Sequence, residues 1–193
     1  MSNAIDTRTA LLAEAETLVR TLGYAAFSYG DLSERVGIRK ASIHHHFSTK
    51  EVLGNALIEN YLERFRAQLA ELSASGGAAT KQLRAYGDFF SGSLAEGQMP
   101  LCGALAADAA YLPPSMQKRV KAFFELHVDW LETVLRNGAA NGEITLFAPP
   151  KRSALLLLST LQGASVVAWA LKDPSVIKPV FRQLLDSISR NDA

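Results

Sequence analysis

A short basic stretch near the start of the chain holds the side chains best suited to binding an anion. Residues 35–50 contain four Lys and Arg side chains and no Asp or Glu, and they include three adjacent histidines, His44, His45 and His46. Residues 51–193, in contrast, hold 14 basic and 14 acidic side chains. A compact basic patch on an otherwise neutral chain suits contact with phosphate groups, and a solvated charged face is the alternative interpretation.

The same residues do not have the spacing of a metal site or of an enzyme active site. Adjacent helical residues point about 100° apart, whereas a two-histidine helical metal site needs a spacing of four residues. The chain has one cysteine, Cys102, and contains neither a P-loop nor a Gly-x-Ser-x-Gly motif. We therefore expect no metal, no cofactor and no enzymatic activity. An enzyme with an unrecognised helical active site is kept as an alternative.

Two short predicted helices joined by a glycine position the basic stretch. Leu32 and Val36 lie one helical turn apart, Gly37 ends their helix, and a second helix is expected over 39–47 with Ile43 and Phe47 inward. Ser28 is placed to cap the first of the two. This pattern predicts a helix-turn-helix, whose second helix can present polar side chains to the major groove of DNA.

The remaining chain is predicted to be helical throughout. Apolar residues recur at helical spacing and are interrupted at glycines and prolines, which gives an all-α fold of about nine helices. Ser48 and Glu51 have the spacing of a capping box at the start of a long helix that runs to about residue 72. Further helices are expected near 80–96, 102–111, 114–137, 151–171 and 173–190. We expect a three-helix head over residues 1–50 and a larger helical body over residues 51–193.

The last two predicted helices have apolar surfaces suited to a partner. Residues 153–171 contain no charged side chain, which approaches a membrane span in length, but Gln162 at the centre is costly in lipid. A helix that is apolar all round is more often buried in a core or an oligomer interface. We therefore predict a homodimer formed through these two helices, with no membrane contact. No secretory signal opens the chain, so we expect a cytoplasmic protein.

The stretch from Phe27 to Leu53 resembles the TetR family of bacterial transcriptional regulators. The family pattern reads roughly Gly-Val-Ser-x-Gly-Thr-Leu-Tyr-x-Tyr/His-Phe-x-Ser/Asn-Lys-Glu. The residues that match it directly are Gly37, Ile43, Phe47, Lys50, Glu51 and Leu53. Ser42 stands for the usual threonine and His46 for the usual Tyr or His. Ala41 and His44 depart from the family's glycine and tyrosine, and neither change prevents a helix.

The resemblance implies a set of DNA contacts. The residues implied are Ser28, Tyr29, Arg39, Lys40, Ser42, His44, His45 and Lys50. Arg39 and Lys40 would face base edges, and His45 would face bases or sugar. The others would contact phosphates, with Lys50 placed at a helix amino terminus that also favours an anion. The expected partner is a pseudo-palindromic double-stranded operator bound by both subunits of a dimer.

The resemblance also implies a small-molecule effector, of unknown identity, bound within the helical body. The candidate lining residues are Tyr86, Phe89, Phe90, Leu105, Asp108, His127, Trp130, Gln162 and Trp169, with core packing as the alternative. For His127 a hydrogen-bonded core position is the first expectation. Cys102 lies where a helix should begin, and a thiol there can have a lowered pKa and act as a sensor. The residues around Cys102 are apolar, however, so an inert buried thiol is the default expectation and the sensor is the alternative.

These observations predict a sequence-specific DNA-binding regulator, acting as a repressor that a small-molecule ligand releases. The alternative is a helical ligand-binding or scaffold protein whose head no longer binds DNA.

Overall fold

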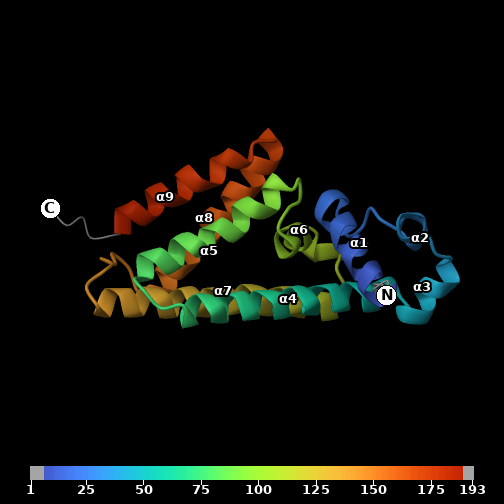
Figure 1. Ribbon diagram of the computed structural model, residues 1–193, viewed down its shortest axis with the longest axis horizontal. Coiled ribbons are helices and arrows are strands. Elements are labelled where there is room, and N and C mark those ends of the chain that lie inside the picture. Colours follow the sequence, from blue (N-terminus) through green and yellow to red (C-terminus); the bar gives the residue numbers. More distant parts are fainter. Residues whose placement is uncertain (1–6, 189–193) are drawn as a thin grey trace, which may run out of the picture. The chain divides into compact units, whose positions relative to one another are not determined.

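The computed structural model describes residues 7–188, and within them the prediction of an all-α fold of about nine helices is confirmed (Figure 1). The helices are α1 (Thr7–Leu22), α2 (Tyr29–Val36), α3 (Lys40–His46), α4 (Lys50–Ala74), α5 (Ala79–Ala95), α6 (Leu101–Ala107), α7 (Pro114–Ala140), α8 (Pro150–Leu171) and α9 (Ile177–Ile188). Two short 3-10 helices, η1 (Ala109–Tyr111) and η2 (Pro174–Val176), follow α6 and α8.

Several predicted helix ends are corrected. The expected capping box at Ser48 and Glu51 is wrong by one residue, because α4 begins at Lys50 and the hydroxyl of Thr49 accepts the hydrogen bond from the Val52 N–H at 3.1 Å. The helix expected through Tyr111 ends at Ala107, and η1 follows it. The last helix begins at Ile177 rather than at Asp173, which instead caps η2. Its predicted final residues, 189 and 190, lie outside the described residues.

The chain divides into two compact units. The first contains the residues up to 63 together with 101–122, and the second contains 64–100 together with the residues from 123 onward. Two of the three boundaries fall within helices, α4 and α7, and the third falls immediately before α6. The functional division into residues 1–50 and 51–193 stays a prediction, because compactness groups residues by packing and not by role.

The first unit is built on α1, which contacts both α2 and α6. Its core contains apolar side chains from all its helices, and the most buried include Leu11, Leu18, Leu32, Ile43, Phe47, Leu53 and Ile58. Burial of a large apolar side chain contributes about 1.5–3 kcal/mol, so this set is what keeps short helices such as α2 and α3 folded.

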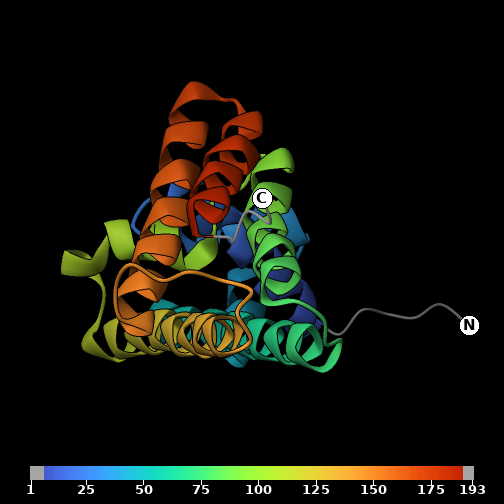
Figure 2. The ribbon, with the colours of Figure 1, turned by 90° about the vertical axis from the view of Figure 1, so that its left-hand side faces the viewer.

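The second unit is built on α5, α8 and α9, which contact one another (Figure 2). α9 approaches α5 closely at Gly87, where an added Cβ would lie 2.5 Å from Phe181 Cδ1. The amino terminus of α5 has no cap of its own, and the Glu143 carboxylate accepts the hydrogen bond from the Ala79 N–H instead. The loop after α7 therefore fixes where α5 begins.

One face of α8 is apolar and exposed. Val166 is 56% exposed and Val167 is 49% exposed, and Leu155 and Leu156 are exposed about three turns earlier on the same helix. Among residues 7–188, α8 is the one helix whose length and composition would permit a membrane span, a criterion that core helices of soluble proteins also meet. This exposed apolar face of α8 either binds a partner or stays in contact with water.

Candidate nucleic-acid interface

The turn between α2 and α3 fixes the direction of α3. Gly37 adopts a left-handed conformation, with φ 73°, and its N–H donates to the Ser33 carbonyl at 2.9 Å. The Ser33 hydroxyl donates in turn to the Ile38 carbonyl at 2.5 Å. A residue with a Cβ rarely adopts this conformation, so glycine is what allows the chain to reverse here. Together these bonds hold α3 at a defined angle to α2.

Ser28 caps α2, as predicted. Its hydroxyl accepts hydrogen bonds from the N–H groups of Gly30 and Asp31, at 3.1 and 3.4 Å, and the Asp31 carboxylate accepts from the Ser28 N–H at 2.7 Å. The hydrogen bonds from Ser28 are the largest cause that lowers the pKa of Asp31, and the nearby Lys40 amine lowers it further. Asp31 is therefore a carboxylate at neutral pH, and it lies beside the predicted phosphate contact.

Tyr29 and His44 contact each other across the turn. The Tyr29 hydroxyl donates to the Phe47 carbonyl at 2.9 Å, and burial raises the pKa of this phenol to about 12. His44 meets the Tyr29 ring edge-on, with 4.9 Å between centroids, and its Nδ1 donates to the Ser48 carbonyl at 3.2 Å. Both predicted DNA contacts therefore also connect α2 to the end of α3.

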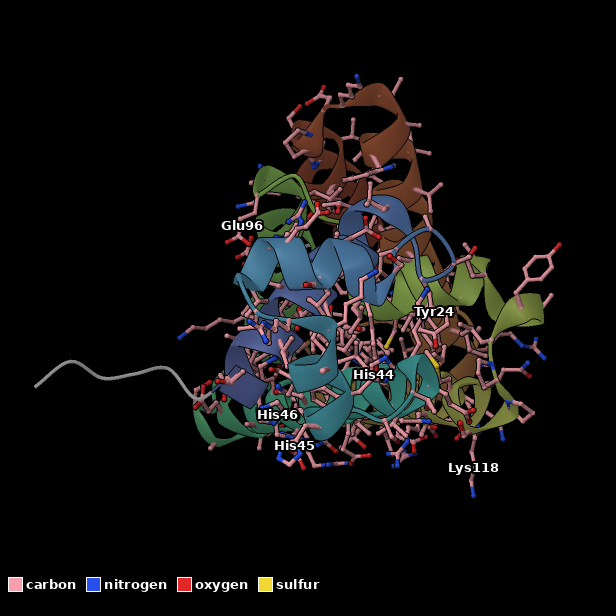
Figure 3. The ribbon with its side chains drawn as sticks, turned by 90° about the vertical axis from the view of Figure 1, so that its right-hand side faces the viewer. Tyr24, His44, His45, His46, Glu96 and Lys118 are labelled. Atoms are coloured by element: carbon pink, nitrogen blue, oxygen red, sulfur yellow. The ribbon has the colours of Figure 1, made fainter. Side chains whose placement is uncertain are left out.

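The outer face of α3 is exposed and carries no acidic residue. Arg39, Lys40, Ser42, His44 and His45 are all exposed, and Figure 3 labels the three adjacent histidines, with His45 and His46 close together. The opposite face carries Ile43, which is fully buried. The structure thus brings five of the eight predicted DNA contacts onto one exposed helix and its cap.

The amine of Lys50 is engaged by contacts within the head, and its predicted phosphate contact stays a prediction. Its amine donates to the Phe27 carbonyl at 2.5 Å and lies over the rings of Tyr24 and Phe27, 4.7 and 4.3 Å from their centroids. Partial burial lowers the pKa of this amine. In this conformation Lys50 fastens the start of α4 to the loop before α2.

The predicted effector residues fall into separate groups. Five of them form one aromatic cluster in the second unit, which contains Tyr86, Phe89, Phe90, His127 and Trp130. Trp169 is 37% exposed and lines a separate surface pocket of about 370 Å³ with Leu94 and Lys172. Leu105 and Asp108 belong to the first unit, and Asp108 lies against the backbone of Gly23. The structure therefore does not gather all nine residues around one site.

His127 occupies a fully buried position, as expected for a core histidine. Its Nδ1 lies 2.7 Å from the Tyr86 hydroxyl, and burial lowers its pKa to about 3, so the ring is neutral at pH 7. Its Nε2 has no hydrogen-bond partner. Of the described residues, three have a buried side-chain polar atom without a partner: Asn55 Oδ1, His127 Nε2 and Gln162 Nε2. Two of the three are on the predicted effector list.

Two residues that contact His127 were not predicted. The Phe123 ring lies 4.2 Å and the Phe65 ring 5.0 Å from the imidazole, centroid to centroid. Phe123 is buried, whereas its neighbour Phe124 is only partly buried. Phe65 gave no signal of its own, because a single aromatic residue on a long helix does not reveal its neighbours.

Cys102 is buried, which agrees with the default expectation of an inert thiol and not with the alternative of a lowered pKa. Burial is the largest cause that raises the pKa of the thiol, and the Glu16 carboxylate raises it further. The short helix α6 begins one residue earlier, but its amino terminus does not compensate for desolvation. The thiol is therefore protonated in this conformation. Among residues 7–188 no group of three His, Cys, Asp or Glu side chains could hold a metal ion.

Residues 11–57 match the family described as bacterial regulatory proteins, tetR family. The chain is similar to a TetR-family transcriptional regulator from Agrobacterium tumefaciens, with 35% identity, a TM-score of 0.92 and coverage of 95% of this chain and 98% of that one. It is also similar to a TetR transcriptional regulator from Legionella pneumophila, with 29% identity, a TM-score of 0.86 and coverage of 97% and 100%.

A curated protein with a named function is similar over most of the chain. The HTH-type transcriptional repressor NemR of Escherichia coli is 26% identical over 167 residues, which is 84% of each chain. The similarity therefore extends well beyond the helix-turn-helix into the second unit.

Proposed function

Because the chain belongs to the TetR family of bacterial regulatory proteins and is a DNA-binding transcriptional regulator, we propose that it is a homodimeric repressor of the cytoplasm that a small molecule releases from its operator. Each subunit inserts α3 into the major groove of one half of a pseudo-palindromic site. Half-sites lie one turn of DNA apart or more, about 34 Å from centre to centre. The role is binding alone, without catalysis.

The exposed face of α3 is the observation that carries this proposal. Arg39 and Lys40 at its start can donate hydrogen bonds to base edges, and a bidentate contact to guanine discriminates by about 1–3 kcal/mol. The Ser28 hydroxyl donates to the Asp31 carboxylate at 2.8 Å, so a phosphate bound by Ser28 would have to replace that bond. Ser42 and His44 supply donors for phosphates, and His45 faces bases or sugar. Because Ile43 and Phe47 are buried beneath α3, these donors are presented at fixed positions.

The apolar face of α8 supports the dimer. Four side chains from α8 and one from α9 that would be costly in water form this exposed surface: Leu155, Leu156, Val166, Val167 and Val180. A second copy of the same chain can cover it by an isologous contact, in which each α8 packs against its counterpart. Dimerisation would also supply the second recognition helix that a palindromic operator requires.

The unpartnered atoms of His127 and Gln162 support an effector site in the second unit. A buried polar atom without a partner costs about 1–3 kcal/mol, so such atoms are rare in native structures. A ligand that satisfies them would stabilise the conformation it binds. It can release DNA only through its difference in affinity between the two conformations of the dimer.

Selection of bound sequences from a random duplex pool tests the function directly. The wild type and the variants Lys40→Ala and Lys81→Ala are compared at about 150 mM salt, where exposed charges are screened within roughly 8 Å. We expect the wild type and Lys81→Ala to enrich the same inverted repeat, since Lys81 is an exposed lysine of the second unit. Lys40→Ala should lose or alter the motif.

The same selection separates the alternatives. If no motif is enriched at any salt concentration, the head does not read sequence and the chain is a helical ligand-binding or scaffold protein. A motif shared unchanged by Lys40→Ala would show that α3 is not the reading helix. Chemical turnover of a bound ligand would favour an enzyme.

A further inference from the structure

We infer that the effector of this protein is an uncharged, mainly apolar aromatic molecule that presents one hydrogen-bond acceptor to Nε2 of His127. This inference rests on the proposed function, because it names the chemical class of the ligand for the effector site in the second unit. Four observations carry it: the unpartnered atom, the hydrogen bond on the other side of the ring, the aromatic surroundings and the absence of buried charge.

His127 has one satisfied nitrogen and one unsatisfied nitrogen. The side chain is 0% exposed, so water does not reach Nε2, and no described group bonds to it. On the other side of the ring, Nδ1 lies 2.7 Å from the Tyr86 hydroxyl. Buried polar atoms in native proteins are normally hydrogen-bonded, so Nε2 is left with one unmade hydrogen bond that a ligand atom can supply.

The Tyr86 bond determines which kind of ligand atom fits. A phenol is a good hydrogen-bond donor, and a neutral imidazole nitrogen without a proton is a good acceptor, so the Tyr86 hydroxyl donates to Nδ1. The proton of the neutral ring then resides on Nε2, which becomes a donor. The atom that satisfies it is an acceptor, such as a carbonyl oxygen.

Burial keeps this imidazole neutral. The pKa of His127 is lowered to about 3, with desolvation as the cause, so the ring adds no positive charge at physiological pH. Within the described part of the second unit, no acid, amine or guanidinium side chain is buried. A carboxylate or ammonium ligand would therefore lose its hydration without gaining an opposite charge.

The surroundings of His127 are aromatic. The Phe65, Tyr86 and Phe123 rings lie within 5.6 Å of the imidazole, centroid to centroid. Phe89 and Trp130 extend the cluster, and Trp130 stacks on Tyr86 at 5.2 Å. Aromatic rings favour offset or edge-to-face contact with another aromatic ring.

The cluster is also reachable. Phe65, Phe89 and Trp130 are only partly buried, so it extends to the surface of the unit. The indole N–H of Trp130 already donates to the Leu69 carbonyl and the Ser73 hydroxyl, at 3.1 and 2.9 Å. His127 is therefore the donor in the cluster that remains for a ligand.

The test uses the full-length dimer and three probes that share a naphthalene ring. 2-Acetonaphthone offers a carbonyl acceptor, naphthalene offers no polar atom, and 2-naphthoate offers a charged carboxylate. Calorimetric titration should show 2-acetonaphthone binding about tenfold tighter than naphthalene, as one hydrogen bond to an otherwise unpaired donor implies. 2-Naphthoate should bind more weakly than either.

Two variants identify the residue responsible. His127→Leu should bind 2-acetonaphthone and naphthalene equally, and circular dichroism verifies that it is folded. Tyr86→Phe keeps the histidine but frees Nδ1, so the imidazole can carry its proton on either nitrogen. In this variant the donor probe 2-naphthol should gain relative to 2-acetonaphthone, whereas in the wild type it should bind more weakly.

The inference is overturned if the wild type does not distinguish the two neutral probes or binds none of them. It is also overturned if 2-naphthoate binds most tightly, or if His127→Leu keeps the preference for the ketone. The selected operator is assayed in parallel. If the probes behave as expected while no operator is enriched, the ligand class stands and the repressor proposal fails. If an operator is enriched but the probes are not distinguished, the repressor proposal stands and the ligand class fails.

Discussion

Two lysines of the head show that position decides what a charged side chain does. Lys40 is exposed at the start of the recognition helix, where its amine can meet DNA. Lys50, ten residues later, directs its amine at the Phe27 carbonyl between two aromatic rings. Substitution of Lys40 should therefore change the affinity for DNA, and substitution of Lys50 should change the stability of the head, although both residues have the same side chain.

For Lys40→Ala we expect weaker operator binding at unchanged thermal stability. Loss of one phosphate or base contact by a cation should also reduce the slope of log affinity against log salt by about one. Fluorescence anisotropy across a salt series measures both, with Lys81→Ala as the matched variant. An unchanged slope together with unchanged affinity would contradict a contact with DNA.

For Lys50→Met we expect a less stable head. The variant keeps most of the aliphatic chain but removes one hydrogen bond and the cation–π contacts, which together contribute about 1–2 kcal/mol. Urea unfolding measures the loss, and Lys40→Met serves as the comparison. If Lys50→Met retains full stability but reduces the salt slope of DNA binding, the amine turns outward to phosphate in the complex.

His127 should make stability depend on pH. Its pKa in the folded protein is about 3, below the ordinary value of 6.5. Below pH 6.5 the unfolded chain takes up a proton that the folded chain does not, so stability is complete above pH 6.5 and falls as pH falls towards 3. Between pH 7 and pH 5, proton uptake by His127 in the unfolded chain lowers the free energy of unfolding by about 2 kcal/mol.

Comparison of the wild type with His127→Gln isolates this contribution from that of the carboxylates. Urea unfolding at pH 7 and pH 5 should show a smaller loss of stability in the variant. If both proteins lose the same amount, the imidazole is accessible to protons in the folded state.

At the scale of the elements, α5 offers a matched pair of glycines. Gly87 faces α9, where an added Cβ would lie 2.5 Å from Phe181, whereas nothing lies within 4 Å of a Cβ at Gly92 on the same helix. Gly92→Ala should stabilise the protein by up to about 1 kcal/mol, because alanine is the better helix former.

Gly87→Ala should destabilise it by about 1–3 kcal/mol, since the packed ring must move. Thermal unfolding of the two variants beside the wild type reports the difference. Equal shifts of both midpoints in the same direction would mean that α9 does not pack closely on α5.

Helices were the part of the structure that the sequence predicted best. Apolar residues at helical spacing locate helices such as α7 and α8 within a few residues, because a buried stripe requires that spacing. The helix-turn-helix was also predictable, since Gly37 and the buried Ile43 and Phe47 each have a local signature. Helix ends were less predictable, as at Thr49, because neighbouring hydroxyl residues compete for the cap.

The direction of individual side chains was not predictable to the same degree. The inward position of Lys50 depends on Tyr24 and Phe27, which lie more than twenty residues earlier. Phe123 and Phe124 differ by one helical step, so periodicity alone could not decide which is buried. The pKa of Cys102 follows from its burial, which is a property of the whole unit and not of the local helix start.

At the scale of the whole molecule, the proposed recognition of a pseudo-palindromic operator requires two copies of the chain. From residue 153 to residue 171, α8 has no charged side chain to keep the subunits apart. We expect a Val166→Asp/Val167→Asp variant to be monomeric, because burying two unpaired carboxylates in an apolar interface is costly. Analytical ultracentrifugation measures the mass, with Phe147→Asp, an exposed loop position, as the control.

The monomeric variant should bind the palindromic operator far more weakly than the wild type does, while its helical content stays the same. A dimeric variant with unchanged operator affinity would place the interface elsewhere on the second unit.

The burial of Cys102 has a practical consequence for measuring the distance between the two recognition helices of a dimer. It is the one thiol in the chain, and its raised pKa makes it slow to react with maleimides or methanethiosulfonates. A cysteine introduced at an exposed position such as Ala41 would therefore take a spin label with little background, and the native residue need not be removed. In a dimer the two labels would report the separation of the recognition helices with and without ligand.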